Sequence, residues 1–448
     1  MYLYLYRCMK SDIISGNLRA GEKLPSKRRL AENLSVSVIT VENAYACLLA
    51  EGYLYSVQKI GYYVSAIETV PLLKKRFSDY TLPQNTPMAV DMRGGQTDTG
   101  SFPVSQWCRL TRKIMTERSE DFFRPCGMSG TRELRAAIAD YLRRNKSIDV
   151  SPDCIVIGAG TEYLCYTVTR LLGRDKLYGM ENPGYRKVST VYESSGAACV
   201  YLPLDGKGLS MAAVRESTAD VLHISPNHHF PTGRVTTAAR RYELLAWAAE
   251  QEGRYIVEDD YDSEFRFDGH PLGSLFSDDK NGRVIYMNTF SKTISPSLRI
   301  GYLVLPPELM ELYVKKSADF SCTVSTSEQL TLAEFISGGY YETYIGRMKK
   351  AYGIRRERFF QMIAESGLSE KLKIQEESAG LHFILALTTP LSDLQIKEKA
   401  SENGIGLAFL SDCLVGNGDA FAHSLLVNYS NTEEAAFGAV LDFLYDIL

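Results

Sequence analysis

Long apolar segments are absent from this 448-residue sequence. No apolar run approaches the ~20 residues that cross a bilayer, so we expect no membrane partner. The first residues, from Met1 to Cys8, lack a basic segment followed by an apolar one, which excludes a secretory signal peptide and predicts a cytoplasmic location. Apolar residues make up 45% and charged residues 23%, which excludes a disordered or fibrous chain.

Closely spaced cysteine pairs are also lacking. The nine cysteines are scattered, and no two have the Cys-x-x-Cys spacing. This pattern favours reduced thiols in the core over a disulfide framework or a zinc ribbon. The six histidines show no metal-ligand spacing, so we expect no metal. His228 and His229 are expected either to line a ligand pocket or to have a structural role.

Charge is unevenly distributed along the chain. Residues 1–76 carry 11 Lys and Arg against 6 Asp and Glu, whereas the remaining residues carry 39 against 48. A basic first part on an acidic remainder favours the binding of a polyanion by the first part.

Residues 1–66 have the pattern of a compact helical unit that ends in a hairpin. One helix is expected from Ser26 to Leu34, and a second begins after the N-cap residue Ser37 and ends at Gly52. The second helix carries apolar side chains at helical spacing, namely Val41, Ala44, Tyr45, Leu48 and Leu49. Two short strands are expected on either side of Lys59. Two helices joined by a tight turn and followed by a hairpin are typical of a winged helix-turn-helix domain that binds DNA.

The segments Gly16–Arg28, Val36–Ser37 and Glu51–Leu54 resemble the GntR-type DNA-binding head. This resemblance implies that the first part binds an operator in double-stranded DNA, with one helix in the major groove and the wing near phosphate. Val38 stands where that family often has Arg or Lys, so one charged contact is missing. The residues expected at the DNA are Ser26, Lys27, Arg28, Ser37, Thr40, Lys59 and Tyr62.

Residues 67–88 are expected to form a linker, because Pro71, Pro83 and Pro87 break regular structure. The basic cluster Lys74–Arg76 is either a solvated hinge, which we favour, or a contact to the DNA backbone.

From residue 89 to residue 448, β-branched runs alternate with helical segments. This alternation predicts an α/β body with a mostly parallel central sheet. We expect a smaller α+β subdomain from about residue 335 onward. The expected strands include 154–157, 221–224, 255–257, 284–287 and 301–304.

Lys292 follows one of these expected strands, at the edge where open α/β sheets bind ligands. A lysine amine forms a Schiff base when its pKa falls enough to leave it partly neutral. Thr289, Ser291 and Arg299 stand close to it in the sequence and could bind a phosphate. Taken alone, such a lysine is usually a solvated surface charge.

Two other strand ends carry complementary residues. Gly160 and Thr161 open a helix whose N-terminus favours an anion, although such a turn is often only tight. Asp259 could keep a pyridine nitrogen protonated, and Tyr261 could donate to a ring phenolate. An acidic loop or a divalent metal site would also explain Asp259, but Lys292 at the neighbouring strand end favours a cofactor.

The segments Glu258–Arg266, Ser291–Tyr302 and His228–Gly233 resemble fold-type I aminotransferases. Behind a GntR-type head, they resemble the MocR/GabR regulators. The resemblance implies the cofactor pyridoxal 5'-phosphate, with its internal aldimine on Lys292, Asp259 at the pyridine nitrogen and Tyr185 stacked on the ring. The expected cofactor-binding residues are Asp259, Tyr261, Tyr185, Gly160, Thr161, Thr289, Ser291 and Arg299.

The chain departs from the aminotransferase pattern at the substrate end. Leu426 stands where aminotransferases hold the substrate carboxylate with an arginine, which disfavours transamination of α-amino acids. Lys187 stands where GabR-like members have a second arginine, with Arg186 beside it. These two are the candidate effector-binding residues. A partner-subunit tyrosine that often touches the phosphate is missing near Pro125.

We therefore expect a DNA-binding transcription regulator, working as a homodimer, that senses a small amine or amino acid through external aldimine formation at Lys292. One alternative is an active aminotransferase with an attached DNA-binding head. Another is a DNA-binding scaffold whose cofactor site is vestigial.

Overall fold

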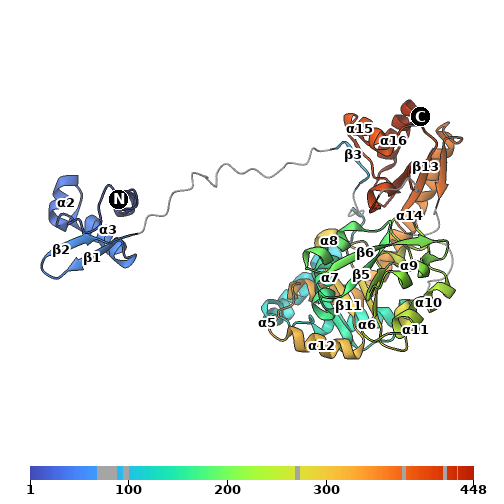
Figure 1. Ribbon diagram of the computed structural model, residues 1–448, viewed down its shortest axis with the longest axis horizontal. Coiled ribbons are helices and arrows are strands. Elements are labelled where there is room, and N and C mark those ends of the chain that lie inside the picture. Colours follow the sequence, from blue (N-terminus) through green and yellow to red (C-terminus); the bar gives the residue numbers. More distant parts are fainter. Residues whose placement is uncertain (68–87, 94–99, 268–272, 376–379, 417–420, 431) are drawn as a thin grey trace. The chain divides into compact units, whose positions relative to one another are not determined.

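The chain divides into two compact units, Met1–Asn85 and Thr86–Leu448 (Figure 1). Most of the predicted linker, including the Lys74–Arg76 cluster, lies outside the residues that the structure describes. The computed structural model describes residues 1–67, 88–93, 100–267, 273–375, 380–416, 421–430 and 432–448.

The first unit consists of three helices and a hairpin, as the sequence pattern predicts. The side chains of Ser26 and Ser37 accept hydrogen bonds from the backbone of Arg29 and Thr40, and these bonds start the second and third helices. The fold is a winged helix-turn-helix. Its elements are α1 (Tyr2–Ile14), α2 (Lys27–Leu34), α3 (Val38–Ala50), β1 (Leu54–Val57) and β2 (Gly61–Val64).

The apolar face of α3 forms the core of this unit. Val41, Ala44, Tyr45 and Leu48 are fully buried. The Tyr45 hydroxyl donates to the Pro25 carbonyl at 2.9 Å, which ties α3 to the start of α2. The expected helical spacing is therefore confirmed, because these side chains share one face of the helix.

The expectations of no membrane-spanning segment and of reduced core thiols can both be compared with the structure. Among the described residues no single helix is long and apolar enough to cross a membrane, although the bent pair α2 and α3 together meets that length and composition. The nine cysteines are free thiols, but only Cys165 is fully buried. Cys199, Cys322 and Cys413 are partly buried and pack against core clusters, whereas Cys8 and Cys108 are exposed, so the expectation of core thiols is wrong for these two.

The second unit is built on an eight-stranded sheet of order β4-β11-β10-β9-β8-β5-β6-β7. The pairs from β10 to β6 are all parallel, whereas β11 runs antiparallel to both of its neighbours and β7 antiparallel to β6. The mostly parallel sheet is confirmed. The strands are β4 (Ile155–Gly158), β5 (Leu177–Asn182), β6 (Ala198–Asp205), β7 (Gly208–Leu209), β8 (Val221–Ile224), β9 (Tyr255–Asp259), β10 (Val284–Thr289) and β11 (Gly301–Val304).

Helices cover both faces of this sheet, so its central strands are buried on both sides. On β10, Tyr286 packs into one core cluster, and Ile285 and Met287 pack into another. The helices are α4 (Val104–Glu117), α5 (Ser119–Phe123), α6 (Arg132–Lys146), α7 (Gly160–Leu172), α8 (Arg186–Ser194), α9 (Met211–Glu216), α10 (Ala238–Ala249), α11 (Leu275–Asp278), α12 (Pro307–Ser317) and α13 (Thr326–Ser337). Short 3-10 turns occur at Pro152–Cys154, Ser263–Phe265, Pro296–Leu298 and Leu410–Cys413.

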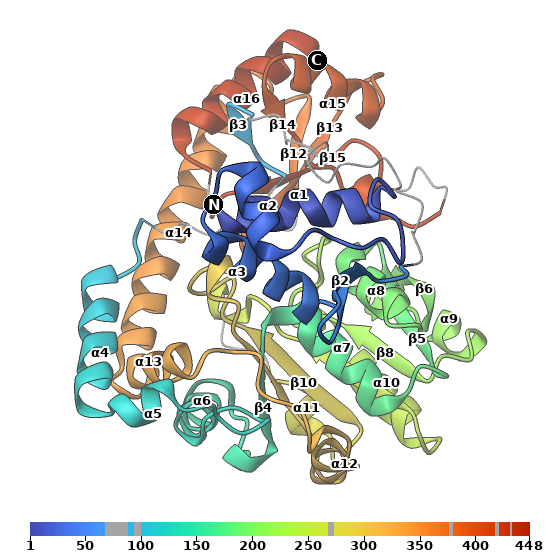
Figure 2. The same cartoon turned by 90° about the vertical axis from the view of Figure 1, so that its left-hand side faces the viewer.

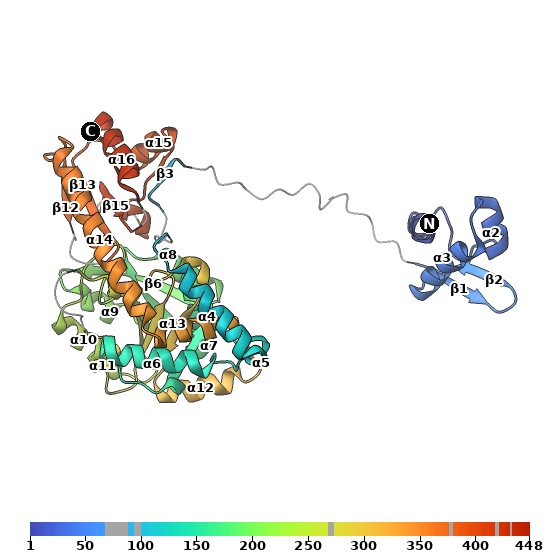
Figure 3. The ribbon, with the colours of Figure 1, turned by 180° about the vertical axis from the view of Figure 1, so that it is seen from behind.

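A smaller α+β part follows, and the long helix α14 (Tyr340–Glu365) runs into it from the main sheet layer (Figure 3). Its three strands are antiparallel and lie beside two helices (Figure 2). Val90–Asp91 (β3) pairs with β14, so residues before the main sheet also join this part. Its elements are β12 (Leu372–Gln375), β13 (His382–Leu387), α15 (Asp393–Glu402), β14 (Ile405–Gly406), β15 (Ser424–Asn428) and α16 (Glu434–Ile447).

Candidate functional site

A cavity of about 840 Å³ lies in the second unit, where the ends of β9 and β10 face the smaller part. The structure brings nearly all of the predicted cofactor and effector residues to its wall. Gly160 is the exception, since it is buried at the start of α7. The predicted residues that line the cavity are Lys292, Asp259, Tyr261, Tyr185, Thr161, Thr289, Ser291, Arg299, Arg186 and Lys187.

Lys292 lies just beyond the end of β10, three residues after the buried Thr289 that ends this strand. Burial lowers the pKa of the Lys292 amine, and the negative charge of Asp262 opposes this shift. A lower pKa leaves more of the amine neutral near pH 7, which is the form that attacks an aldehyde.

Asp259 ends β9 and is 8% exposed. Its Oδ2 atom lies 3.5 Å from His223 Nε2, and the other ring nitrogen of His223 lies 2.9 Å from the Tyr192 hydroxyl. Its buried Oδ1 atom has no hydrogen-bond partner among the described residues. A buried carboxylate oxygen without a donor is costly, so this atom is suited to accept a bond from a ligand N–H.

The start of α7 and the Arg299 side chain form the other end of the site. Gly160 has φ +78°, and a Cβ atom there would lie 2.7 Å from Arg299 Nη2. The Arg299 guanidinium lies 3.1 Å from the Glu162 carboxylate, and Lys187 pairs with the same carboxylate. Glu162 therefore pairs with two of the predicted cations, an arrangement that no local sequence pattern indicates.

Tyr261 reaches the cavity with His228 behind it. The Tyr261 hydroxyl lies 2.9 Å from His228 Nδ1, which also lies 2.9 Å from an oxygen of Asp262. His228 does not line the cavity, so it acts on the site through Tyr261. His229 is buried and lies within hydrogen-bond distance of Thr232, and burial lowers its pKa to about 3. Of the two expectations for His229, the structural role therefore fits better.

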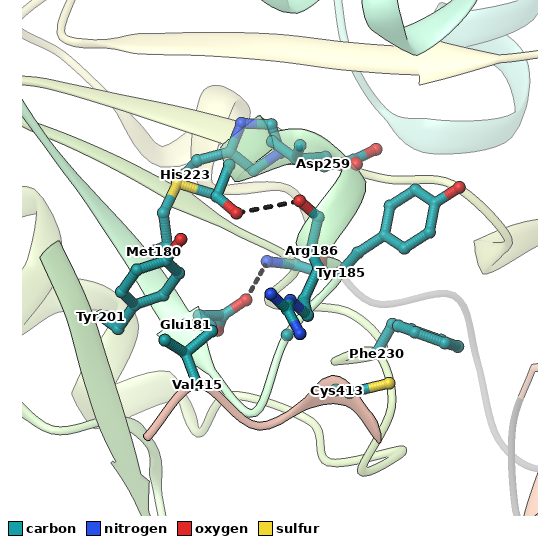
Figure 4. A pocket seen from close by; sticks show the side chains of 14 residues that line it. Met180, Glu181, Tyr185, Arg186, Tyr201, His223, Phe230, Asp259, Cys413 and Val415 are labelled. Carbon is teal, nitrogen blue, oxygen red and sulfur yellow. Dashed lines mark hydrogen bonds and ion pairs between the residues drawn. The ribbon is translucent and has the colours of Figure 1, made fainter. Parts of the chain in front are cut away.

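A small pocket of about 30 Å³ adjoins the main cavity behind Tyr185 (Figure 4). Glu181 lies in it and accepts a hydrogen bond from the backbone of Ser225 at 2.9 Å. Burial raises the pKa of Glu181 to about 8. Its oxygen lies 3.7 Å from His229, but both groups are neutral near pH 7, so this contact is not an ion pair.

Apart from Leu426, sequence reasoning missed the residues that the smaller part contributes to the cavity. His382 on β13 lines it, and its Nε2 atom lies 3.0 Å from the Pro231 carbonyl oxygen. Burial lowers the pKa of His382 to about 4, so the ring is neutral. Lys397 and Asp412 also line the cavity and form an ion pair. These residues reach the cavity because segments far apart in the sequence pack together, so no local sequence pattern identifies them.

The predicted DNA-binding residues all lie in the first unit, but their side chains differ in availability. Ser26 and Ser37 cap helices, and Thr40 bonds to the Ser37 hydroxyl at 2.8 Å. Lys27 pairs with Glu42 at 2.6 Å, which raises the lysine pKa, and lies 5.6 Å from the centre of the Tyr62 ring. Arg28 and Lys59 are exposed. These two are therefore the cations best placed to meet a phosphate.

Comparisons with known proteins agree with both halves of this description. The family of bacterial regulatory proteins, gntR family, matches residues 1–64, and aminotransferase class I and II matches residues 91–405. A multiple substrate aminotransferase from Thermococcus profundus has a TM-score of 0.70 at 21% identity over 81% of this chain and 91% of its own, which shows the fold alone.

Two curated regulators are similar over nearly the whole chain. The uncharacterized HTH-type transcriptional regulator YdeL of Bacillus subtilis is 34% identical, over 90% of this chain and 88% of its own length. The probable rhizopine catabolism regulatory protein MocR of Rhizobium meliloti is 32% identical, over 92% and 86%.

The fold family implies pyridoxal 5'-phosphate, and the residues present fit it. The unpartnered Oδ1 atom of Asp259 suits a protonated ring nitrogen, and the half-buried Lys292, whose amine has a lowered pKa, suits an aldehyde. The close approach of Arg299 to Gly160 leaves no room for a side chain where the phosphate end is expected. The two family matches and the similarity to MocR over nearly the whole chain show that it belongs to the MocR-type family, in which a GntR-type head is joined to an aminotransferase class I and II domain.

Proposed function

We propose that this transcription regulator senses a small amino compound at the cavity that contains Lys292, and that this binding changes how the first unit binds DNA. One observation carries the proposal: Lys292 and the unpartnered Asp259 oxygen share a cavity in a chain that also has a winged helix-turn-helix. The pyridoxal cofactor supplies an aldehyde that condenses with primary amines.

Each residue of the cavity has a distinct part in this proposal. Lys292 would hold the cofactor through its amine, which a competing primary amine could replace. Asp259 would accept a hydrogen bond from a protonated ring nitrogen, and Tyr261, oriented by His228, would donate to the ring oxygen. Tyr185 would cover the ring. The start of α7 with Thr161, Thr289, Ser291 and Arg299 would hold the phosphate.

Sensing requires that the compound bind one conformation of the protein better than another. The cavity lies between the main sheet and the smaller part, since Lys292 comes from one and Leu426 from the other. A bound compound therefore contacts both the main sheet and the smaller part. The difference between its affinities for two arrangements of these parts supplies the free energy that couples compound binding to DNA binding.

Active transamination is the weaker alternative. Leu426 lines the cavity and is 7% exposed, so an apolar side chain stands at the position where the resemblance places a carboxylate-binding arginine. Without that cation the α-carboxylate of an amino acid loses its bidentate partner. Turnover would appear as keto acid formed in proportion to amino acid consumed, and we expect none.

We further propose a cytoplasmic homodimer, on the basis of the DNA-binding head and the resemblance to aminotransferases. Light scattering of the purified protein should give about 100 kDa, twice the 50.1 kDa of one chain. A value near that of one chain would contradict the dimer.

The sensing proposal is tested by two titrations of the full-length, cofactor-loaded protein. A panel of amines and amino acids is followed through the cofactor absorbance, and binding to the DNA upstream of the chain's own gene is followed by fluorescence anisotropy. A compound that changes the absorbance should also change the DNA affinity, and Lys292→Met should abolish both responses. Absorbance changes that leave DNA affinity unaltered would contradict the proposal.

A further inference from the structure

Part of the cavity wall on the side of the smaller part is apolar. Leu426 and Leu381 lie on it and are 7% and 3% exposed, and Phe230 faces the cavity from the main sheet layer. Ile384 stands opposite Leu426 in the β13–β15 register, so the two side chains lie side by side on one face of the sheet and form an apolar cluster with Leu410. The polar side chains of His382 and Asn428, which also line the cavity, stand opposite each other one step along the same face. Neither is a cation, since burial lowers the pKa of His382 to about 4.

The other cations that line the cavity lie at its margin and are paired. Each has a side chain that is 30 to 52% exposed and a carboxylate partner. A ligand carboxylate would have to break one of these pairs to gain a partner. The pairs are Arg93 with Asp91, Lys397 with Asp412, and Lys187 and Arg299 with Glu162.

Arg186 is the remaining cation of the wall apart from Lys292, and it is exposed at the start of α8. Water screens an exposed guanidinium, so its attraction for a carboxylate is weak. It also lines the small pocket behind Tyr185, next to Cys413 and Val415 (Figure 4). Arg186 and Tyr185 therefore border both the main cavity and the small pocket. This position makes Arg186 a poor anchor for a ligand group that contacts Leu426.

We propose that the compound sensed is a primary amine with an apolar body and no carboxylate on the carbon that bears the amine. An apolar group placed against Leu426 and Phe230 gains burial. A carboxylate at the same place loses water without gaining a cation as its partner. This inference rests on the proposed function, because it needs an amine that competes with Lys292.

Matched pairs of compounds test the inference in the full-length, cofactor-loaded protein. 2-Phenylethylamine and phenylalanine differ only by a carboxylate, as do 3-methylbutylamine and leucine. The concentration that gives half of the absorbance change should be lower for each amine by about tenfold or more. An amino acid that acts at an equal or lower concentration than its amine would overturn the inference but leave the sensing proposal standing. If no compound changes the absorbance, the sensing proposal fails with it.

A substitution at Leu426 tests the wall itself. Leu426→Arg places a cation on it and should move the preference toward the amino acids. Leu426→Met keeps the wall apolar at similar volume and should keep the preference for the amines. Equal preferences in the two variants would overturn the role of this wall. Near-UV circular dichroism verifies the fold of each variant, and the comparison of matched compounds in the natural protein is decisive even if Leu426→Arg does not fold.

Discussion

Burial sets opposite protonation states for two neighbouring groups of the site. It lowers the pKa of the Lys292 amine and raises the pKa of the Glu181 carboxyl to about 8. Both shifts have the same cause, because a low-dielectric surrounding disfavours whichever form is charged. The main cavity therefore has a lysine that loses its proton easily, and the small pocket beside it has a carboxyl that keeps its proton.

Glu181 gives the chain a pH-dependent loss of stability. The carboxyl ionises near its usual pKa of 4.5 in the unfolded chain but near 8 in the folded one, so the folded state binds more protons between these values. Stability must then fall as pH rises through this window. Glu181→Gln keeps an acceptor for the Ser225 backbone and cannot ionise, so its advantage over the natural protein should grow from pH 5 to pH 8 by about 1–3 kcal/mol.

Urea unfolding of the cofactor-free protein at several pH values measures this difference. Glu216→Gln, at an exposed position on α9, serves as the control and should show no such growth. A difference between Glu181→Gln and the natural protein that stays constant with pH would contradict the assignment.

The predicted cofactor residues converge on one cavity because each follows a strand of the same sheet edge. Strand ends and their polar residues are visible in a sequence, and Lys292, Asp259 and Thr289 were identified in this way. The ion pairs that hold Arg299 and Lys187 were not, because Glu162 belongs to another segment and only the folded arrangement brings the three together.

At the scale of elements, the turn between β4 and α7 is the most constrained part of the site. The positive φ of Gly160 strains any other residue, and a Cβ atom there would displace the Arg299 guanidinium. Gly160→Ala should weaken cofactor binding by about tenfold or more. Equilibrium dialysis of the cofactor measures the effect.

Gly206→Ala is the matched control, since a Cβ atom at Gly206 meets nothing within 4 Å. It should bind the cofactor as the natural protein does. Equal affinity in Gly160→Ala and Gly206→Ala would show that the turn does not hold the phosphate.

Element types were predictable from periodicity and capping, whereas pairing was not. The spacing of apolar residues in α3 and the N-cap residue Ser37 predicted that helix. The alternation of strands and helices predicted the mostly parallel sheet. The antiparallel direction of β11 depends on how residues 290–300 connect it to β10, and the pairing of β3 with β14 joins residues far apart in the chain. Neither leaves a local pattern.

At the scale of the whole molecule, the two compact units predict that DNA binding and cofactor binding can be lost separately. Arg28 is exposed on α2, so Arg28→Ala should weaken DNA binding and lower the slope of its salt dependence by about one. The cofactor absorbance should not change.

Lys280→Ala is the control for this prediction, because Lys280 is an exposed lysine of the second unit. It should alter neither property. DNA affinity that is the same in Arg28→Ala and Lys280→Ala at every salt concentration would place the DNA surface elsewhere on the first unit.

The central claim is that the cofactor's aldehyde is held by one particular amine of this chain. Borohydride reduction of the cofactor-loaded protein, followed by peptide mapping, tests it most directly. The account predicts a single pyridoxyl group, on Lys292. A group on another lysine, or none after the cofactor has been supplied, would contradict it.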